Sequence, residues 1–235
     1  MSAPQTVADS KRAFHAAFPH VIAPLHRRMV DELLVELHLL SHQQGFHTDP
    51  LFAVGLIQVF DAFARGYRPE QHRGQLLEAL CSASGFDANE LRRASEQALA
   101  TMGSHGMDQV KGWIESGGAD APEPLATALN GIRRPDFHYS RLMAVGLLSL
   151  LERAQGADGL DPQTLRGFAH DLAAAMGLLR ERVDKDLTLY VSNLEKMAQA
   201  VELMEETIAA ERRRRERGQQ PEAVSESPEA APSGG

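Results

Sequence analysis

Residues 183–208 read VDKDLTLYVSNLEKMAQAVELMEETI, and this stretch decides the fold. Its apolar side chains recur at alternating steps of four and three residues, which places them along one face of an α-helix. Neither Pro nor Gly interrupts residues 178–217. The pattern therefore predicts one helix of about 38 residues, about 57 Å long at 1.5 Å per residue. The apolar positions are Val183, Leu187, Tyr190, Leu194, Met197, Val201, Met204 and Ile208.

The residues beside this apolar seam indicate what the helix packs against. With Leu187 at heptad position a, the flanking e and g positions include Val191, Ala198 and Ala200. A parallel dimeric coiled coil usually has Glu and Lys there. Apolar and small residues widen the stripe, which favours packing on several helices of the same chain. We expect the first half to dock on the chain's own body and the charged end past Met204 to project; a homodimeric coiled-coil scaffold is the alternative.

Further helices are predicted upstream, because start signals precede apolar residues at helical spacing. These signals stand at Thr6 or Asp9, Pro24, Asp49-Pro50, Pro69, Asp87 and Asp161-Pro162. Loops are expected at 117–124 and 134–136, and no alternating run predicts a strand. The predicted fold is all-α, with a compact multi-helix domain and a long heptad-patterned C-terminal helix. The predicted boundaries are 1–179 for the domain, 180–217 for the long helix and 218–235 for a disordered tail.

The composition excludes several classes of protein. A net charge of −8 argues against a nucleic-acid-binding protein, which usually presents a basic face. The single cysteine, Cys81, cannot form an internal disulfide and is interpreted as a small buried hydrophobic residue. No stretch reaches the roughly 18–20 apolar residues that cross a bilayer. We therefore expect at most a peripheral attachment to a membrane.

The helix predicted from Pro24 to Ser41 is the best candidate in the sequence for a catalytic or metal site. It carries Glu32, Glu36, His38 and His42, but no Glu stands three residues before a His, as a di-iron bundle site requires. Glu36 and His38 lie about 200° apart around the helix. A solvated helix face is the simpler interpretation, and a metal-dependent helical enzyme using these four residues is the alternative. No nucleophile, nucleotide or dinucleotide motif is present, so neither catalytic residues nor a cofactor are predicted.

Short segments in a fixed order resemble one known family over about residues 6–217. They are DSKRAF at 9–14, RR at 27–28 with DEL at 31–33, FDAF at 60–63 with GYRPE at 66–70, YSRL at 139–142 with GL at 146–147, and DLTLY at 186–190 with SNLEKMAQA at 192–200. These segments resemble the thylakoid formation factors, which are photosystem II biogenesis proteins of cyanobacteria and chloroplasts.

This resemblance implies a non-enzymatic role in thylakoid organisation and in photosystem II assembly or repair. It implies peripheral attachment at the cytoplasmic side of the thylakoid membrane. The implied partners are an FtsH-type membrane protease and the photosystem II assembly and repair machinery. Plant members of the family carry a transit leader, whereas the family motif here starts at Asp9, so a cyanobacterial source is expected.

Charged pairs and two polar turns are the candidates for partner binding. An Asp61–Arg65 ion pair is expected before the turn at Tyr67, because the two residues are four apart on a helix. A monomer is favoured over a dimer. The predicted partner-binding residues are Lys11, Arg12, Arg27, Arg28, Tyr67, Arg68, Arg141, Glu205, Glu206, Arg212 and Arg213.

Overall fold

The computed structural model describes residues 5–154 and 160–218. Across those ranges the chain forms ten helices and no strand, so the predicted all-α fold with a long C-terminal helix is confirmed. The helices are α1 (Val7–Ala17), α2 (Pro24–Ser41), α3 (Pro50–Phe63), α4 (His72–Ser82), α5 (Ala88–Gly103), α6 (Met107–Ser116), α7 (Leu125–Gly131), α8 (Arg141–Arg153), α9 (Pro162–Ala175) and α10 (Arg180–Gly218).

Side-chain caps set several of the helix starts. Thr6 and Asp9 form a reciprocal capping box at the start of α1. Asp49, Asp87 and Asp161 each accept hydrogen bonds from backbone N–H groups in the first turn of the helix that follows. These groups would otherwise lack partners. The predicted starts of α1, α3, α5 and α9 are therefore confirmed.

Two elements differ from the prediction. Helix α4 begins at His72 and not at Pro69, because the backbone N–H groups of His72 and Arg73 bond to carbonyls three residues earlier and form turns. Helix α7 lies between the two predicted loops and was missed. It has seven residues and no side-chain cap, so neither a periodic pattern nor a start signal marks it.

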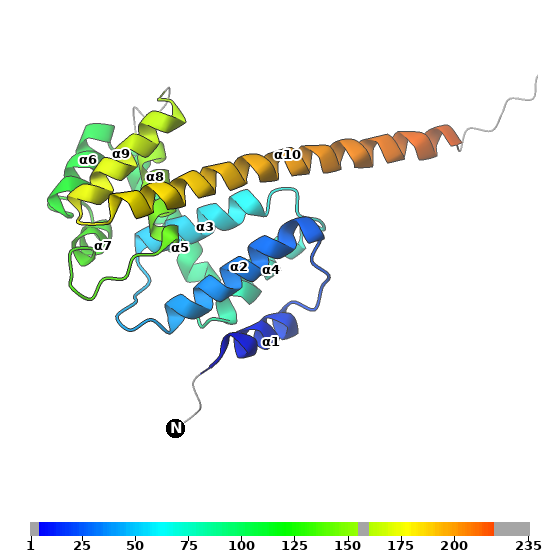
Figure 1. Ribbon diagram of the computed structural model, residues 1–235, viewed down its shortest axis with the longest axis horizontal. Coiled ribbons are helices and arrows are strands. Elements are labelled where there is room, and N and C mark those ends of the chain that lie inside the picture. The colour runs from blue at the N-terminus through cyan, green and yellow to red at the C-terminus, as the bar shows by residue number, and fades with distance from the viewer. Residues whose placement is uncertain (1–4, 155–159, 219–235) are drawn as a thin grey trace, which may run out of the picture.

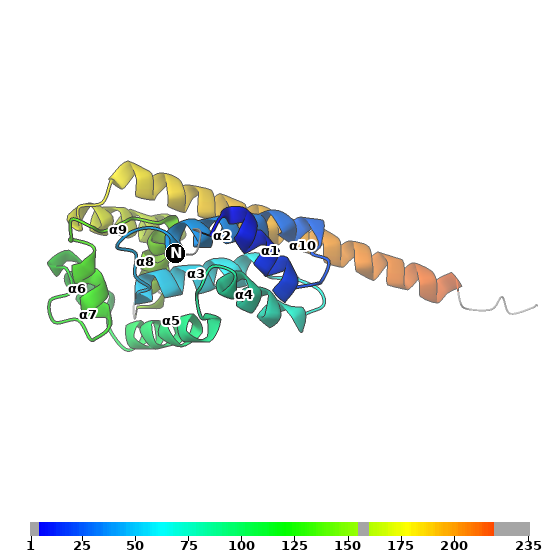
Figure 2. The same cartoon turned by 90° about the horizontal axis from the view of Figure 1, so that it is seen from below.

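Helices α3 and α8 cross at the centre of the core. A Cβ atom added to Gly55 of α3 would lie 1.7 Å from the Leu142 carbonyl oxygen, and one added to Gly146 of α8 would lie 2.0 Å from the Leu51 carbonyl oxygen. The two backbones are therefore in direct contact, which only glycine permits at these positions. Figure 2 shows α3 between α5 on one side and α10 on the other.

The first half of α10 lies across this body, and its C-terminal end extends beyond the other helices (Figure 1). Val183 and Leu187 are fully buried, and Val201 packs against Gly66 in the turn after α3. A Cβ on Gly66 would lie 2.7 Å from the Val201 side chain, and its φ of 73° also favours glycine. Contrary to the predicted wide stripe, Ala198 is exposed.

Past Met204 the helix has almost no cover. Side chains at 205–216, called the projecting end below, are exposed except for the half-buried Ala209. The division of the chain into separate units at residues 179 and 217 stays a prediction. Apart from Gly218, which ends α10, the tail predicted to be disordered lies outside the described residues.

Cys81 is fully buried, as predicted, and burial raises the pKa of its thiol to about 12. No helix within the described ranges combines the length and the apolar content needed to cross a membrane.

Candidate functional site

A groove runs between α2 and α10, and residues of α3 and α8 also line it. Its deepest part is a cavity of about 260 Å³ between all four helices. This cavity opens into a wider space of about 1150 Å³ along the outer side of α2. Most of the cavity wall is apolar: Leu25, Met29 and Leu33 from α2, Val59 and Phe63 from α3, Leu142 and Val145 from α8, and Leu189, Tyr190 and Met197 from α10. The remaining lining residues are charged or polar: Arg28, Glu32, Arg141, Asp186, Asn193 and Lys196.

An ion-pair network crosses the groove from α2 to α8. Ser140 caps α8 by accepting a hydrogen bond from Met143, so the helix starts at Arg141. The Arg141 Nε donates to Glu36 Oε2 at 2.7 Å, and its Nη1 lies 3.8 Å from Glu32 Oε2. Arg28 Nε donates to the other oxygen of Glu32 at 2.8 Å. Two carboxylates of α2 are thus held by two arginines.

Glu36 is the most enclosed member of this network, with 15% of its side chain exposed. Burial raises the pKa of its carboxyl, while the charge and hydrogen bond of Arg141 act in the opposite direction. A buried ion pair of this kind fixes the relative position of two helices, because breaking it leaves a buried charge without a partner.

A second contact ties α10 to the start of α8. The Tyr139 hydroxyl donates to Asp186 Oδ2 at 2.9 Å, and the Arg182 guanidinium lies 4.9 Å from the centroid of the Tyr139 ring. Burial, followed by the hydrogen bond to Asp186, raises the pKa of the Tyr139 phenol well above its usual range. The segments at 27–33, 139–142 and 186–190, which lie far apart in the sequence, therefore meet in one groove.

The structure gathers only some of the predicted partner-binding residues. Lys11, Arg27, Arg28 and Arg141 line the groove. Glu205, Glu206, Arg212 and Arg213 all lie on the projecting end, and Arg68 is exposed in the turn before α4. Sequence reasoning missed Glu36, Asp186 and Lys196 as groove residues. Asp186 and Lys196 lie inside the segments that carry the family resemblance, and this position could have marked them as candidate site residues.

Tyr67 does not have the exposure that its predicted role requires. Only 3% of the residue is exposed, and its ring lies 5.0 Å from that of His26. The expected pairing of Asp61 with Arg65 is also wrong. Asp61 instead accepts from Arg73 of α4 at 2.9 Å, because the turn after α3 brings α4 back beside it.

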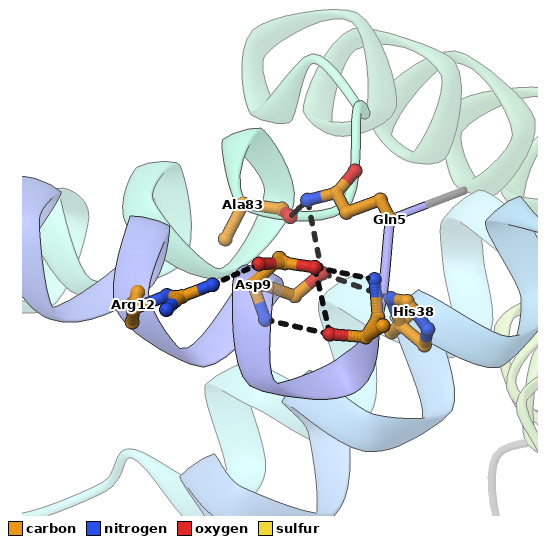
Figure 3. A network of polar contacts seen from close by, with 7 residues as sticks. Gln5, Asp9, Arg12, His38 and Ala83 are labelled. Atoms are coloured by element: carbon orange, nitrogen blue, oxygen red, sulfur yellow. Dashed lines mark hydrogen bonds and ion pairs between the residues drawn. The ribbon is translucent and has the colours of Figure 1, made fainter. Parts of the chain in front are cut away.

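Arg12 lies in a polar network that fastens α1 to the body (Figure 3). Its side chain pairs with Asp9, and hydrogen bonds from Thr6, followed by Arg12, lower the pKa of that carboxyl to about 2. Gln5 Nε2 donates to the Ala83 carbonyl at 3.3 Å. Arg12 therefore already has a partner within its own helix.

The four residues of the alternative metal site do not converge. Glu32 and Glu36 face arginines in the groove, whereas the His38 Nδ1 lies 2.9 Å from the Ser10 hydroxyl at the contact with α1. The His42 ring lies 4.3 Å from that of His38, so the two histidines are neighbours, but neither glutamate joins them. Among the residues that the structure describes, no three His, Cys, Asp or Glu side chains are grouped as metal ligands. The arrangement supports a structural role for His38 at the contact between α1 and α2.

Comparisons with known proteins match the chain over almost all of its length. A family model described as "Thylakoid formation protein" matches residues 6–219. The chain is 57% identical to "Protein Thf1" of Prochlorococcus marinus (strain MIT 9313) over 220 residues, covering 93% of this chain and 90% of that one. It is 52% identical to "Protein Thf1" of Synechococcus sp. (strain CC9902), covering 93% and 96%.

A solved structure gives the same result for the fold. The structure described as Psb29 superposes with a TM-score of 0.77 at 37% sequence identity, covering 90% of this chain and 99% of that one. Together these matches confirm the resemblance to thylakoid formation factors, and these named relatives are cyanobacterial proteins.

Proposed function

The chain belongs to the thylakoid formation protein family, and on that premise we propose that it is a non-enzymatic thylakoid biogenesis factor that supports photosystem II assembly or repair. It acts by binding and stabilising an FtsH-type membrane protease. It attaches peripherally to the cytoplasmic face of the thylakoid membrane. The family is named for the formation of a membrane and not for a reaction, which supports a role in binding.

The projecting end of α10 is the observation that carries this proposal. Its side chains at 205–216 are exposed almost throughout, although an isolated helix of this length is only marginally stable in water. Here the docked first half of α10 holds it in helical form. A preformed helix loses little conformational freedom when it binds, which favours its use as a docking surface.

The chemistry of the projecting end suits a protein partner. Acidic Glu205 and Glu206 come first, and a run of four arginines follows at 212–215. Within the projecting end Ile208 is 38% exposed, and Leu203, two residues before its start, is 64% exposed. Apolar anchors within a charged rim are typical of protein–protein interfaces.

Deletion tests this assignment. A chain that lacks residues 205–235 should lose co-purification with FtsH subunits from gently solubilised thylakoids. Its melting temperature should change by less than about 2 °C, because the deleted helix contributes almost no core. Deletion of residues 219–235 alone is the matched control and should leave co-purification unchanged.

Two results would count against the proposal. Full-length protein that consistently fails to recover FtsH subunits would remove the protease from the mechanism. A large fall in melting temperature on deleting 205–235 would show that the projecting end stabilises the body, and loss of binding would then have no specific meaning.

A further inference from the structure

The cavity between α2, α3, α8 and α10 has the features of a ligand site. Protein interiors are usually packed as densely as organic crystals, and an apolar cavity of about 150 Å³ is enough to bind benzene. This cavity measures about 260 Å³, and ten of its sixteen lining residues are aliphatic or aromatic. It opens on one side, where charged groups of α2, α8 and α10 surround the entrance.

The charge at the entrance is positive, in a chain whose net charge is −8. Six basic and four acidic side chains line the groove. Asp31 pairs with Arg27 at 3.9 Å, and Glu32 and Glu36 pair with arginines, whereas Asp186 keeps its charge and accepts a hydrogen bond from the Tyr139 hydroxyl.

Three basic side chains of the groove are not neutralised in this way. Lys11, Lys196 and Arg182 form no ion pair within residues 5–154 and 160–218, and the Arg182 guanidinium lies 4.9 Å from the centroid of the Tyr139 ring. The groove therefore has spare positive charge above an apolar interior.

The size of the cavity selects among possible occupants. An α-helix with its side chains is about 10 Å across, which is too wide for a cavity of about 260 Å³. An acyl chain fits, because about nine methylenes fill 260 Å³ if each takes roughly the 30 Å³ of a water molecule. A carboxylate at the end of such a chain would reach the entrance, where Lys196 lies.

We propose that this cavity binds a free single-chain anionic amphiphile of the fatty-acid class. The acyl chain lies between Met29, Val59, Phe63 and Met197, and the carboxylate faces Lys196 and Arg28 at the entrance. The site is distinct from the projecting end, so it stands or falls independently of protease binding.

A series of straight-chain carboxylates tests the proposal by titration calorimetry on the full chain, below their critical micelle concentrations. Each buried methylene contributes about a fourfold gain in affinity. Affinity should therefore rise about fifteenfold from hexanoate to octanoate and again to decanoate, then level off once the cavity is full. Binding should be saturable, with one ligand per chain. Decyltrimethylammonium, with the opposite charge, should bind much more weakly.

Two variants locate the site. Lys196→Glu should weaken decanoate binding about tenfold or more, because it replaces an attractive charge at the entrance with a repulsive one. Leu189→Trp, at a residue that is 48% exposed at the entrance, should obstruct entry without altering the core. Lys185→Glu is the matched control: Lys185 is exposed on the same helix and lies outside the cavity.

Several outcomes would overturn the proposal. Absence of saturable binding, equal affinity for the cationic amphiphile, or no effect of either site variant would each do so. Binding to vesicles that contain anionic lipid, without binding of free decanoate, would assign the positive groove to a bilayer surface instead. Competition by an acidic helical peptide but not by decanoate would assign it to a protein.

Discussion

The contact between α3 and α8 predicts an unusually large effect of one methyl group. In Gly146→Ala the new Cβ would lie 2.0 Å from the Leu51 carbonyl oxygen, whereas ordinary contact begins at 3.4 Å. The helices must separate by about 1.4 Å, because neither backbone has a rotamer that could relieve the clash. Overpacking of this kind costs about 3 kcal/mol. The higher helix propensity of alanine returns about 1 kcal/mol, so the free energy of unfolding should fall by about 2 kcal/mol.

Thermal unfolding followed by circular dichroism measures this effect. For a chain of this size, a change of 1 kcal/mol shifts the melting temperature by roughly 2–4 °C, so Gly146→Ala should melt about 4–8 °C lower. The matched control is Gly112→Ala on α6, where a Cβ would meet nothing within 4 Å. The control should gain about 1 kcal/mol from helix propensity alone. If both variants were stabilised alike, the close crossing of α3 and α8 would be refuted.

Arg141→Met should lower the free energy of unfolding, measured by urea titration, by about 1–3 kcal/mol at pH 8. The loss should be smaller at pH 5, because the folded-state pKa of Glu36 is raised and stability is lost as the pH rises through it. Adding Glu36→Gln should restore the stability lost at pH 8, because it removes the buried charge. Burial lowers the pKa of His26. The stability that His26 contributes should therefore be complete above the unfolded-state pKa of 6.5 and be lost as the pH falls through the lowered folded-state pKa. His26→Gln should reduce the difference between the unfolding curves measured at pH 7.5 and at pH 5.5. Cys81 should resist a disulfide reagent at pH 8 until urea unfolds the chain, and unchanged reactivity on unfolding would contradict its burial. Light scattering should give a monomer, since the seam residues Val183, Leu187 and Val201 are already buried within the chain itself, and a dimer would contradict this.

Local rules in the sequence were enough for most of the fold. Capping aspartates and apolar periodicity act within one or two turns, so they mark α3, α5, α9 and α10 without knowledge of the rest of the chain. Helix α7 escaped because seven residues carry little periodic signal. Gly55 and Gly146 could be seen in the sequence, but their mutual contact depends on how two distant helices cross.

The groove could be predicted only in part, because it too depends on how distant helices pack together. Each segment of the sequence marks its own basic residues, such as Arg28 and Arg141, but does not show which side chains they face. That Arg141 binds Glu36 and that Tyr139 binds Asp186 depends on packing across 105 and 47 residues of sequence. Spacing along one helix also suggested the wrong partner for Asp61, because tertiary structure offered Arg73 instead.

The contact between Gly66 and Val201 has a mechanical consequence for the molecule. It is the last firm support of α10 before the helix leaves the body. From Val201 to the end at Gly218 the helix runs about 26 Å at 1.5 Å per residue. A tilt of about 10° at this fulcrum would carry the tip through about 4–5 Å, nearly the pitch of one helical turn. A small change in the angle at which α10 leaves the body, beside the groove, would therefore displace the far end of the helix by several ångströms.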